Sequence, residues 1–192
     1  MISEMPRKKR VYCSVRYLHL VGNEWVRASL DDPNLSHRLL SVAKQAQLPL
    51  RDRLIMHFAS RYGICIRDIL RLTIGDWRVC ECQLELLSPR QVSRGQGVKV
   101  LCLRPDTESL LHAYIHGERK DYDPEHRELS QLAETDPLFL TAKGRAYGYE
   151  AFVPQWETMC QSAGISLPPR GLRHWFVIRM LRQIEERTRD PG

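Results

Sequence analysis

The spacing of apolar residues changes along this chain of 192 residues, and that change restricts the fold more than any other feature. Between residues 35 and 72, apolar side chains recur every three or four positions, as in amphipathic helices that bury one face. The clearest repeat is predicted to face a core and consists of Leu54, Ile55, Phe58, Ala59 and Tyr62. Helical spacing returns later, in 107–115, 150–163 and 172–187.

The middle of the chain has a different pattern. Segments 77–87 and 97–103 are predicted to be strands, and a polar turn rich in glycine, 93–97, joins them. A charged, net acidic segment, 119–136, contains Pro124 and is predicted to be a surface loop. The sequence therefore predicts an α+β domain that is mainly α-helical and has one small antiparallel sheet.

Residues 1–30 differ from the rest of the chain. The basic run Arg7-Lys8-Lys9-Arg10 is followed by β-branched and aromatic residues, interrupted at Gly22-Asn23. That pattern predicts a basic arm and a β-hairpin in 1–30, ahead of a domain in 31–192. We expect Arg7, Lys8, Lys9 and Arg10 to be a flexible tail or an arm that reaches DNA phosphates.

The chain is basic, with a formal net charge of +6 and a pI near 9.1. Such an excess suits a polyanion, because lysine and arginine release counterions when they bind phosphates. The apolar runs are shorter than a membrane span, and the basic start does not lead into the apolar core of a secretory signal. We expect a cytoplasmic protein without a membrane partner, associated with the nucleoid when it binds DNA.

The cysteines and histidines do not form a recognisable ligand set. Cys80 and Cys82 lie on one face of a predicted strand, but a zinc site needs a second pair at ligand spacing. His112 and His116 share a helix face at i, i+4, without a third ligand. We therefore expect neither a metal nor a cofactor.

Three motifs follow one another in a specific order. Residues 53–77 form the first, and Leu138-Phe139-Leu140 begins the second, which extends to 163–165. The third is Pro169-Arg170-Gly171-Leu172-Arg173-His174-Trp175-Phe176. Their order and spacing resemble the catalytic domain of the tyrosine recombinases, the phage-integrase family, over residues 31–187. The resemblance implies the DNA breaking-rejoining fold, and strand cleavage and rejoining through a phosphotyrosine link.

The resemblance also implies roles for particular residues. The second-box arginine falls on Arg173 and its following histidine on His174, although these could also form an internal salt bridge and a core histidine. The histidine three positions earlier falls on Arg170, which can contact phosphate but is a poor proton carrier near neutral pH. The lysine of the sheet turn falls on or near Arg94, or on Lys99 in the next strand. These basic groups are expected to line a scissile phosphate.

Two parts of the family pattern are missing. The first-box arginine falls on Cys65, whose thiol cannot stabilise the charge of a phosphate. Arg67 is a candidate substitute, but it lies about 200° further round a helix and should face elsewhere unless the helix start is shifted. The pattern favours an exposed helix charge at Arg67, paired with Asp68 or the neighbours of Arg71, over a relocated catalytic group. The tyrosine nucleophile would lie beyond the last residue, and Tyr147 and Tyr149 occupy no family nucleophile position.

From these observations we expect a double-stranded DNA-binding protein of the integrase family, which acts in the DNA recombination or integration of a mobile element. As it stands, the chain is expected not to cleave DNA. It could be the truncated front of an active enzyme or a degenerate relative, and Cys65 favours the second. The alternative is a protein-interaction module that kept the fold and docks on a second copy or a partner recombinase.

Overall fold

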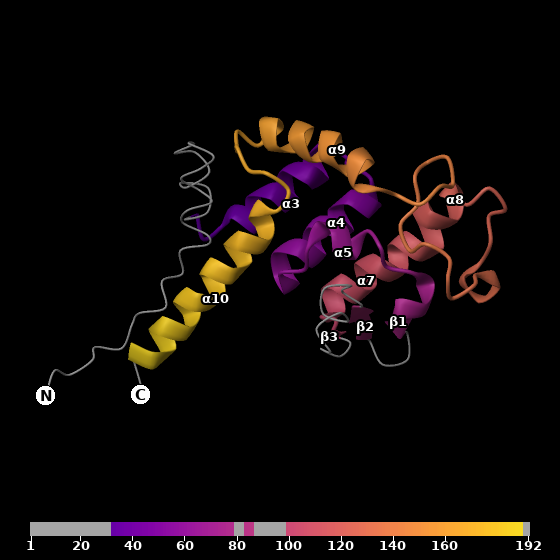
Figure 1. Cartoon of the computed structure of the whole chain (residues 1–192). Helices are drawn as coiled ribbons and strands as arrows, with labels where there is room; N and C mark the ends of the chain where they lie inside the picture. The colour runs from indigo at the N-terminus through magenta and orange to yellow at the C-terminus, as the bar shows by residue number, and fades with distance from the viewer. Residues whose placement is uncertain (1–31, 79–82, 87–98, 190–192) are drawn as a thin grey trace, which may run out of the picture.

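The computed structural model describes residues 32–78, 83–86 and 99–189. Within them, helices of different lengths make up most of the domain, and one small sheet lies at its edge (Figure 1). The helices before the sheet are α3 (Leu35–Gln45), α4 (Leu50–Tyr62), α5 (Ile66–Ile69) and the 3-10 turn η1 (Ile74–Asp76). Those after it are α7 (Pro105–Tyr114), the π-helical η3 (Ile115–Arg119), α8 (Lys120–Tyr122), the 3-10 turn η4 (Leu129–Gln131), α9 (Tyr149–Ser162) and α10 (Gly171–Arg189). The hairpin predicted in 1–30 lies outside the described residues.

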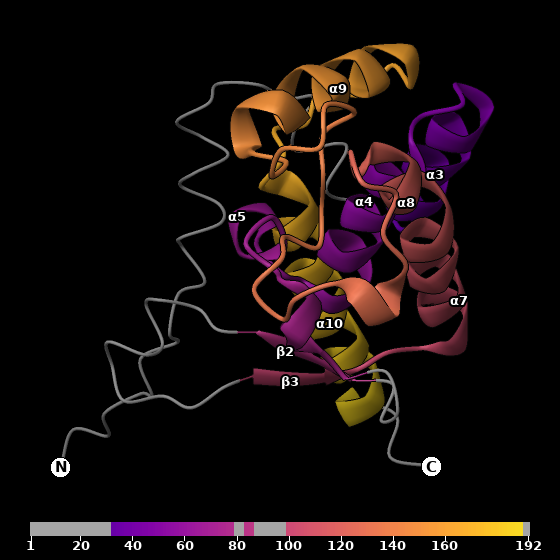
Figure 2. The ribbon, with the colours of Figure 1, turned by 90° about the vertical axis from the view of Figure 1, so that its right-hand side faces the viewer.

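The three short strands pair in sequence order. They are β1 (Trp77–Arg78), β2 (Gln83–Leu86) and β3 (Lys99–Cys102), and both pairs are antiparallel. The strand β3 falls within 97–103 as predicted, but the segment 77–87, predicted to be one strand, contains two strands, β1 and β2, that pair with each other. The sheet and α9 lie at opposite ends of the domain in both views (Figures 1 and 2).

Helix α4 is the centre of the core. It packs against α3, α5, α7 and α10. Four residues of the apolar face predicted for it, Leu54, Ile55, Phe58 and Ala59, are buried, and the fifth, Tyr62, is half-buried. Its first turn begins after Pro49, and its free N–H groups need acceptors from elsewhere. The carboxylate of Glu118 in η3 accepts the backbone N–H of Leu50 (2.5 Å) and that of Arg51 (3.1 Å). A negative charge at this end of α4 also complements the helix dipole.

Two expectations from the sequence need correction. The helix expected from residue 107 begins at Pro105, because proline suits the first helical position. The predicted surface loop 119–136 contains two buried charges, Arg119 and Asp123, each 1% exposed. Arg119 donates to the backbone carbonyl oxygens of Pro137 and Leu138. The loop is thus anchored to the core, and charge alone did not predict its position.

None of the described helices is long and apolar enough to cross a membrane.

Candidate functional site

A pocket of about 440 Å³ opens where three distant segments of the chain meet. It is bordered by the loop from α4 to α5, the first residue of α9 and the start of α10. Its polar and ionisable lining side chains are Cys65, Arg67, Tyr149, Arg170, Arg173 and His174. The pocket therefore gathers the candidates of the first and third sequence motifs.

The loop from α4 to α5 is held against α10 at Gly63. This residue ends α4 with a φ of 64°, a conformation that suits glycine. A Cβ built there would lie 2.3 Å from Cδ1 of Phe176 in α10. Both the backbone conformation and the close approach therefore require glycine, and they set Cys65 beside Arg173.

The start of α5 decides which way Arg67 points. The helix begins at Ile66, and Cys65 precedes it in an extended conformation with φ −68° and ψ 133°. The rotation of about 100° per helical residue therefore does not run from Cys65 to Arg67. Both side chains line the same pocket, so the expectation that Arg67 faces elsewhere fails because the helix begins after Cys65.

Arg67 also has a contact that the sequence did not suggest. Its guanidinium carbon lies 4.8 Å from the centre of the Tyr149 ring, a distance typical of a cation–π contact. The ring restricts where the guanidinium can point. Tyr149 thus belongs to the pocket as a support for Arg67. The only sequence signal for it was a tyrosine in a loop rich in glycine, directly before a helix.

The position of Tyr149 is fixed by a buried cluster next to it. The hydroxyl of Tyr147 donates to Oδ1 of Asp52 at 2.7 Å, and the Arg51 guanidinium lies 3.6 Å from the Tyr147 ring centre. Arg51 also donates to the carbonyl oxygen of Leu140 (2.7 Å) and to Asp52 (3.0 Å). Burial, together with the neighbouring Asp52 charge, raises the pKa of Tyr147, so its hydroxyl remains a donor. The start of α9 is therefore bound to the first turn of α4.

The start of α10 is anchored through Leu167. Its backbone carbonyl oxygen accepts the indole N–H of Trp156 at 2.6 Å, and the thiol of Cys160 lies 3.6 Å away. A Cβ on Gly171 would meet Cδ1 of Leu167 at 2.4 Å, so this chain crossing also requires glycine. Burial raises the pKa of Cys160 to about 12, which keeps the thiol protonated. These contacts set the turn that carries Arg170 and Arg173.

The electrostatics of the pocket are those of an anion site. Arg67, Arg170 and Arg173 are exposed to solvent, and His174 is half-buried. Burial, and then the nearby charges of Arg170 and Arg173, lower the pKa of His174 below its usual value. The imidazole is therefore neutral at pH 7 and can donate or accept a hydrogen bond. The arginine forks match the geometry of phosphate oxygens.

Among the described residues, the lining of the pocket includes none of the other candidates. Lys99 is the first residue of β3, while Arg94 and the basic run 7–10 fall outside the described residues. Cys80 and Cys82 also lie outside them. The rings of His112 and His116 stack with centres 5.9 Å apart. In the described ranges, no three His, Cys, Asp or Glu side chains come together as a metal site.

Comparison with a solved structure identifies the fold. No family model matches the chain, and no curated protein matches it. Among solved structures it is similar to XerA recombinase, with a TM-score of 0.60 and 19% sequence identity. The match covers 79% of this chain and 50% of that one, so the chain spans about half the length of XerA. At this identity the likeness shows the fold alone, and the chain has a mainly helical, recombinase-like fold.

Proposed function

We propose that this chain is a double-stranded DNA-binding protein of the tyrosine recombinase type, which acts in the recombination or integration of a mobile element. The observation that carries the proposal is the pocket with three arginines, together with the recombinase-like fold. Arg67 comes from a segment about a hundred residues before Arg170 and Arg173 in sequence. Three guanidinium groups in one pocket supply the positive charge and hydrogen-bond donors that bind a backbone phosphate. Contacts to phosphates position DNA without reading its sequence.

Each residue in the pocket has a proposed task. Arg173 and Arg67 hold the non-bridging oxygens of one phosphate, and Tyr149 keeps the Arg67 guanidinium in place. Arg170 adds positive charge, and neutral His174 hydrogen-bonds an oxygen. Cys65 supplies no charge, so Arg67 replaces the arginine that the family resemblance would put there.

The proposal concerns binding, and not strand cleavage. Two arginines on one phosphate would suit a phosphorane, but a phosphotyrosine link also requires a tyrosine aimed at the phosphorus atom. Tyr149 is engaged by Arg67 through its ring, and Tyr147 donates to Asp52. We therefore propose that the chain as it stands binds DNA without cutting it.

One observation favours a second candidate function, a protein-interaction module. Helix α10 exposes an apolar stripe at i, i+3, i+4 and i+7, namely Val177, Met180, Leu181 and Ile184, with exposed fractions of 43%, 40%, 40% and 56%. This is the spacing by which one helix packs on another. A second copy of the chain, or a partner recombinase, could cover the stripe.

The salt dependence of duplex binding distinguishes the two candidates. For the DNA-binding function, log K for a duplex of arbitrary sequence should fall linearly with log salt, with a slope of about −0.9 or steeper. Each phosphate that the chain neutralises contributes about −0.9, and the arginine pocket is assigned one phosphate. Fluorescence anisotropy across a series of sodium chloride concentrations measures the slope. Weak binding with a slope near zero would contradict the proposal and favour the interaction module.

A further inference from the structure

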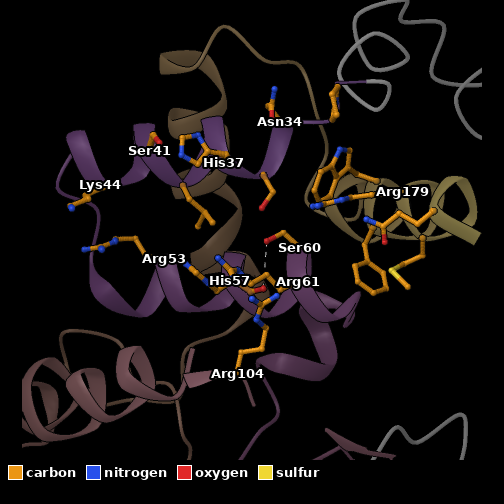
Figure 3. A pocket seen from close by; sticks show the side chains of 17 residues that line it. Asn34, His37, Ser41, Lys44, Arg53, His57, Ser60, Arg61, Arg104 and Arg179 are labelled. Carbon is orange, nitrogen blue, oxygen red and sulfur yellow. Dashed lines mark hydrogen bonds between the residues drawn. The ribbon is translucent and has the colours of Figure 1, made fainter. Parts of the chain in front are cut away.

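A second basic cavity lies between α3, α4 and α10 and shares no lining residue with the arginine pocket. It is a groove of about 730 Å³ (Figure 3). Five cationic side chains line it, Lys44, Arg53, Arg61, Arg104 and Arg179, and no Asp or Glu is among its described lining residues. Phe176 lines this basic groove and packs on Gly63, two residues before Cys65 of the pocket.

Much of the positive charge in the basic groove is not compensated. Asp106 pairs with Arg61 at 2.6 Å and lies 4.0 Å from Arg104, so one carboxylate serves two arginines. Within the described part of the chain, neither Lys44 nor Arg53 has an ion-pair partner. In Figure 3, these two residues lie at one end of the groove and Arg179 at the other. An extended anion would fit such an arrangement better than a single small ion.

His57 lines the groove, and nearby charges affect its pKa. Burial, and then the charge of Arg61, lower its pKa to about 4; Asp106 opposes this shift, and Arg53 adds a smaller lowering effect. Its Nδ1 is buried and has no hydrogen-bond partner among the described residues. The positive charges of Arg61 and Arg53 therefore act on a half-buried imidazole that lines the groove.

The lining favours backbone phosphates over bases. Proteins that hold single strands stack bases on exposed aromatic rings. Here Trp175 is only 2% exposed, and Phe176 is half-buried with one ring edge against Gly63, so the groove offers little open ring face. Arginine forks and a lysine are suited to phosphate oxygens. A duplex, which presents its phosphates and hides its bases, matches this chemistry.

We propose that the groove between α3, α4 and α10 is a second nucleic-acid contact, which binds the phosphates of a duplex independently of the arginine pocket. The ligand class rests on the proposed DNA-binding function, but the residues do not overlap with those of the pocket. Since α10 presents one face to each site, the chain can engage duplex backbone on two sides of that helix.

The variant Lys44→Gln/Arg53→Gln tests this contact. We expect it to weaken binding of a random-sequence duplex by about tenfold or more at moderate salt. We also expect its salt slope to be less steep by about 1.8, since each lost phosphate contact removes about 0.9. The matched control is Lys143→Gln/Arg145→Gln, which removes the same charge from two exposed residues that line neither cavity, and it should leave the slope unchanged.

A site-specific readout accompanies the affinity measurement. The pKa of His57, followed by NMR of the wild-type chain labelled at its histidines, should rise when duplex is added, because a phosphate favours the imidazolium. Thermal unfolding confirms that each variant is folded. Unchanged affinity and slope in the folded variant, with the His57 pKa unmoved, would overturn the proposal. Equal competition by single-stranded DNA or by polyglutamate would overturn the assignment to duplex phosphates.

The two sites can fail separately. If Lys44→Gln/Arg53→Gln weakens binding and substitutions of Arg67 and Arg173 do not, the groove is a nucleic-acid site and the proposed role of the pocket is wrong. If only the pocket substitutions weaken binding, the groove proposal is wrong and the proposed function remains.

Discussion

Replacing Arg119 with methionine is expected to lower the free energy of unfolding by about 3–5 kcal/mol, the range seen when one partner of a buried charge pair is removed. The side chain is 1% exposed, and its Nη2 donates to the carbonyl oxygen of Pro137 at 2.9 Å. Its Nε lies within bonding distance of the carbonyl oxygens of Pro137 (3.3 Å) and Leu138 (3.2 Å). Methionine fills similar volume but leaves those acceptors short of a donor, and it removes the positive charge that lies 3.9 Å from the buried Asp123 carboxylate. Urea denaturation followed by circular dichroism measures the loss.

The control for that substitution is Arg38→Met. Arg38 pairs with Asp32 at 2.8 Å, but its side chain is 53% exposed. An exposed pair of this kind contributes at most about 1 kcal/mol. If Arg119→Met costs no more than Arg38→Met, the anchoring of loop 119–136 by Arg119 is contradicted.

The variant Arg67→Gln/Arg173→Gln is expected to weaken duplex binding by about a hundredfold or more at low salt. A hydrogen bond to a charged group contributes about 1.5–3 kcal/mol, and each factor of ten corresponds to about 1.4 kcal/mol. Because both guanidiniums are assigned to one phosphate, the two single substitutions should not be additive. Anisotropy titrations of the wild-type chain and the three variants measure both effects.

Cys65→Ala is the matched control in the same pocket. It alters a lining residue without changing charge, so affinity should stay within about threefold of wild type, less than the tenfold that 1.4 kcal/mol represents. A double variant that binds like wild type, or a Cys65→Ala variant that loses as much as the double, would contradict the assignment of a phosphate to Arg67 and Arg173.

The sequence predicts the helices well because their apolar spacing reflects the core directly. Leu54, Ile55, Phe58 and Ala59 recur on one face because that face packs inward, and they are buried. The resemblance of the last motif to a recombinase box likewise anticipated the fold that the likeness to XerA shows. These predictions needed only local pattern and order along the chain.

The features that the sequence did not predict depend on the exact residue at which a helix begins, or on contacts between residues far apart in the sequence. The orientation of Arg67 follows from a helix that begins at Ile66, and periodicity does not determine a helix start to one residue. Arg119 looks like a surface charge until the carbonyl oxygens of Pro137 and Leu138 are found beside it. The basic groove brings together residues of three helices, so only tertiary packing reveals it.

The pKa of His174, measured by NMR with and without duplex, tests the central claim most directly. Without DNA, burial and the charges of Arg170 and Arg173 keep the pKa of His174 below its usual value. A phosphate in the arginine pocket opposes those charges and favours the imidazolium. We therefore predict that a saturating duplex raises the pKa of His174 by roughly one unit or more. A His174 pKa that stays low while the duplex is bound would show that DNA does not enter this pocket, and would contradict the account.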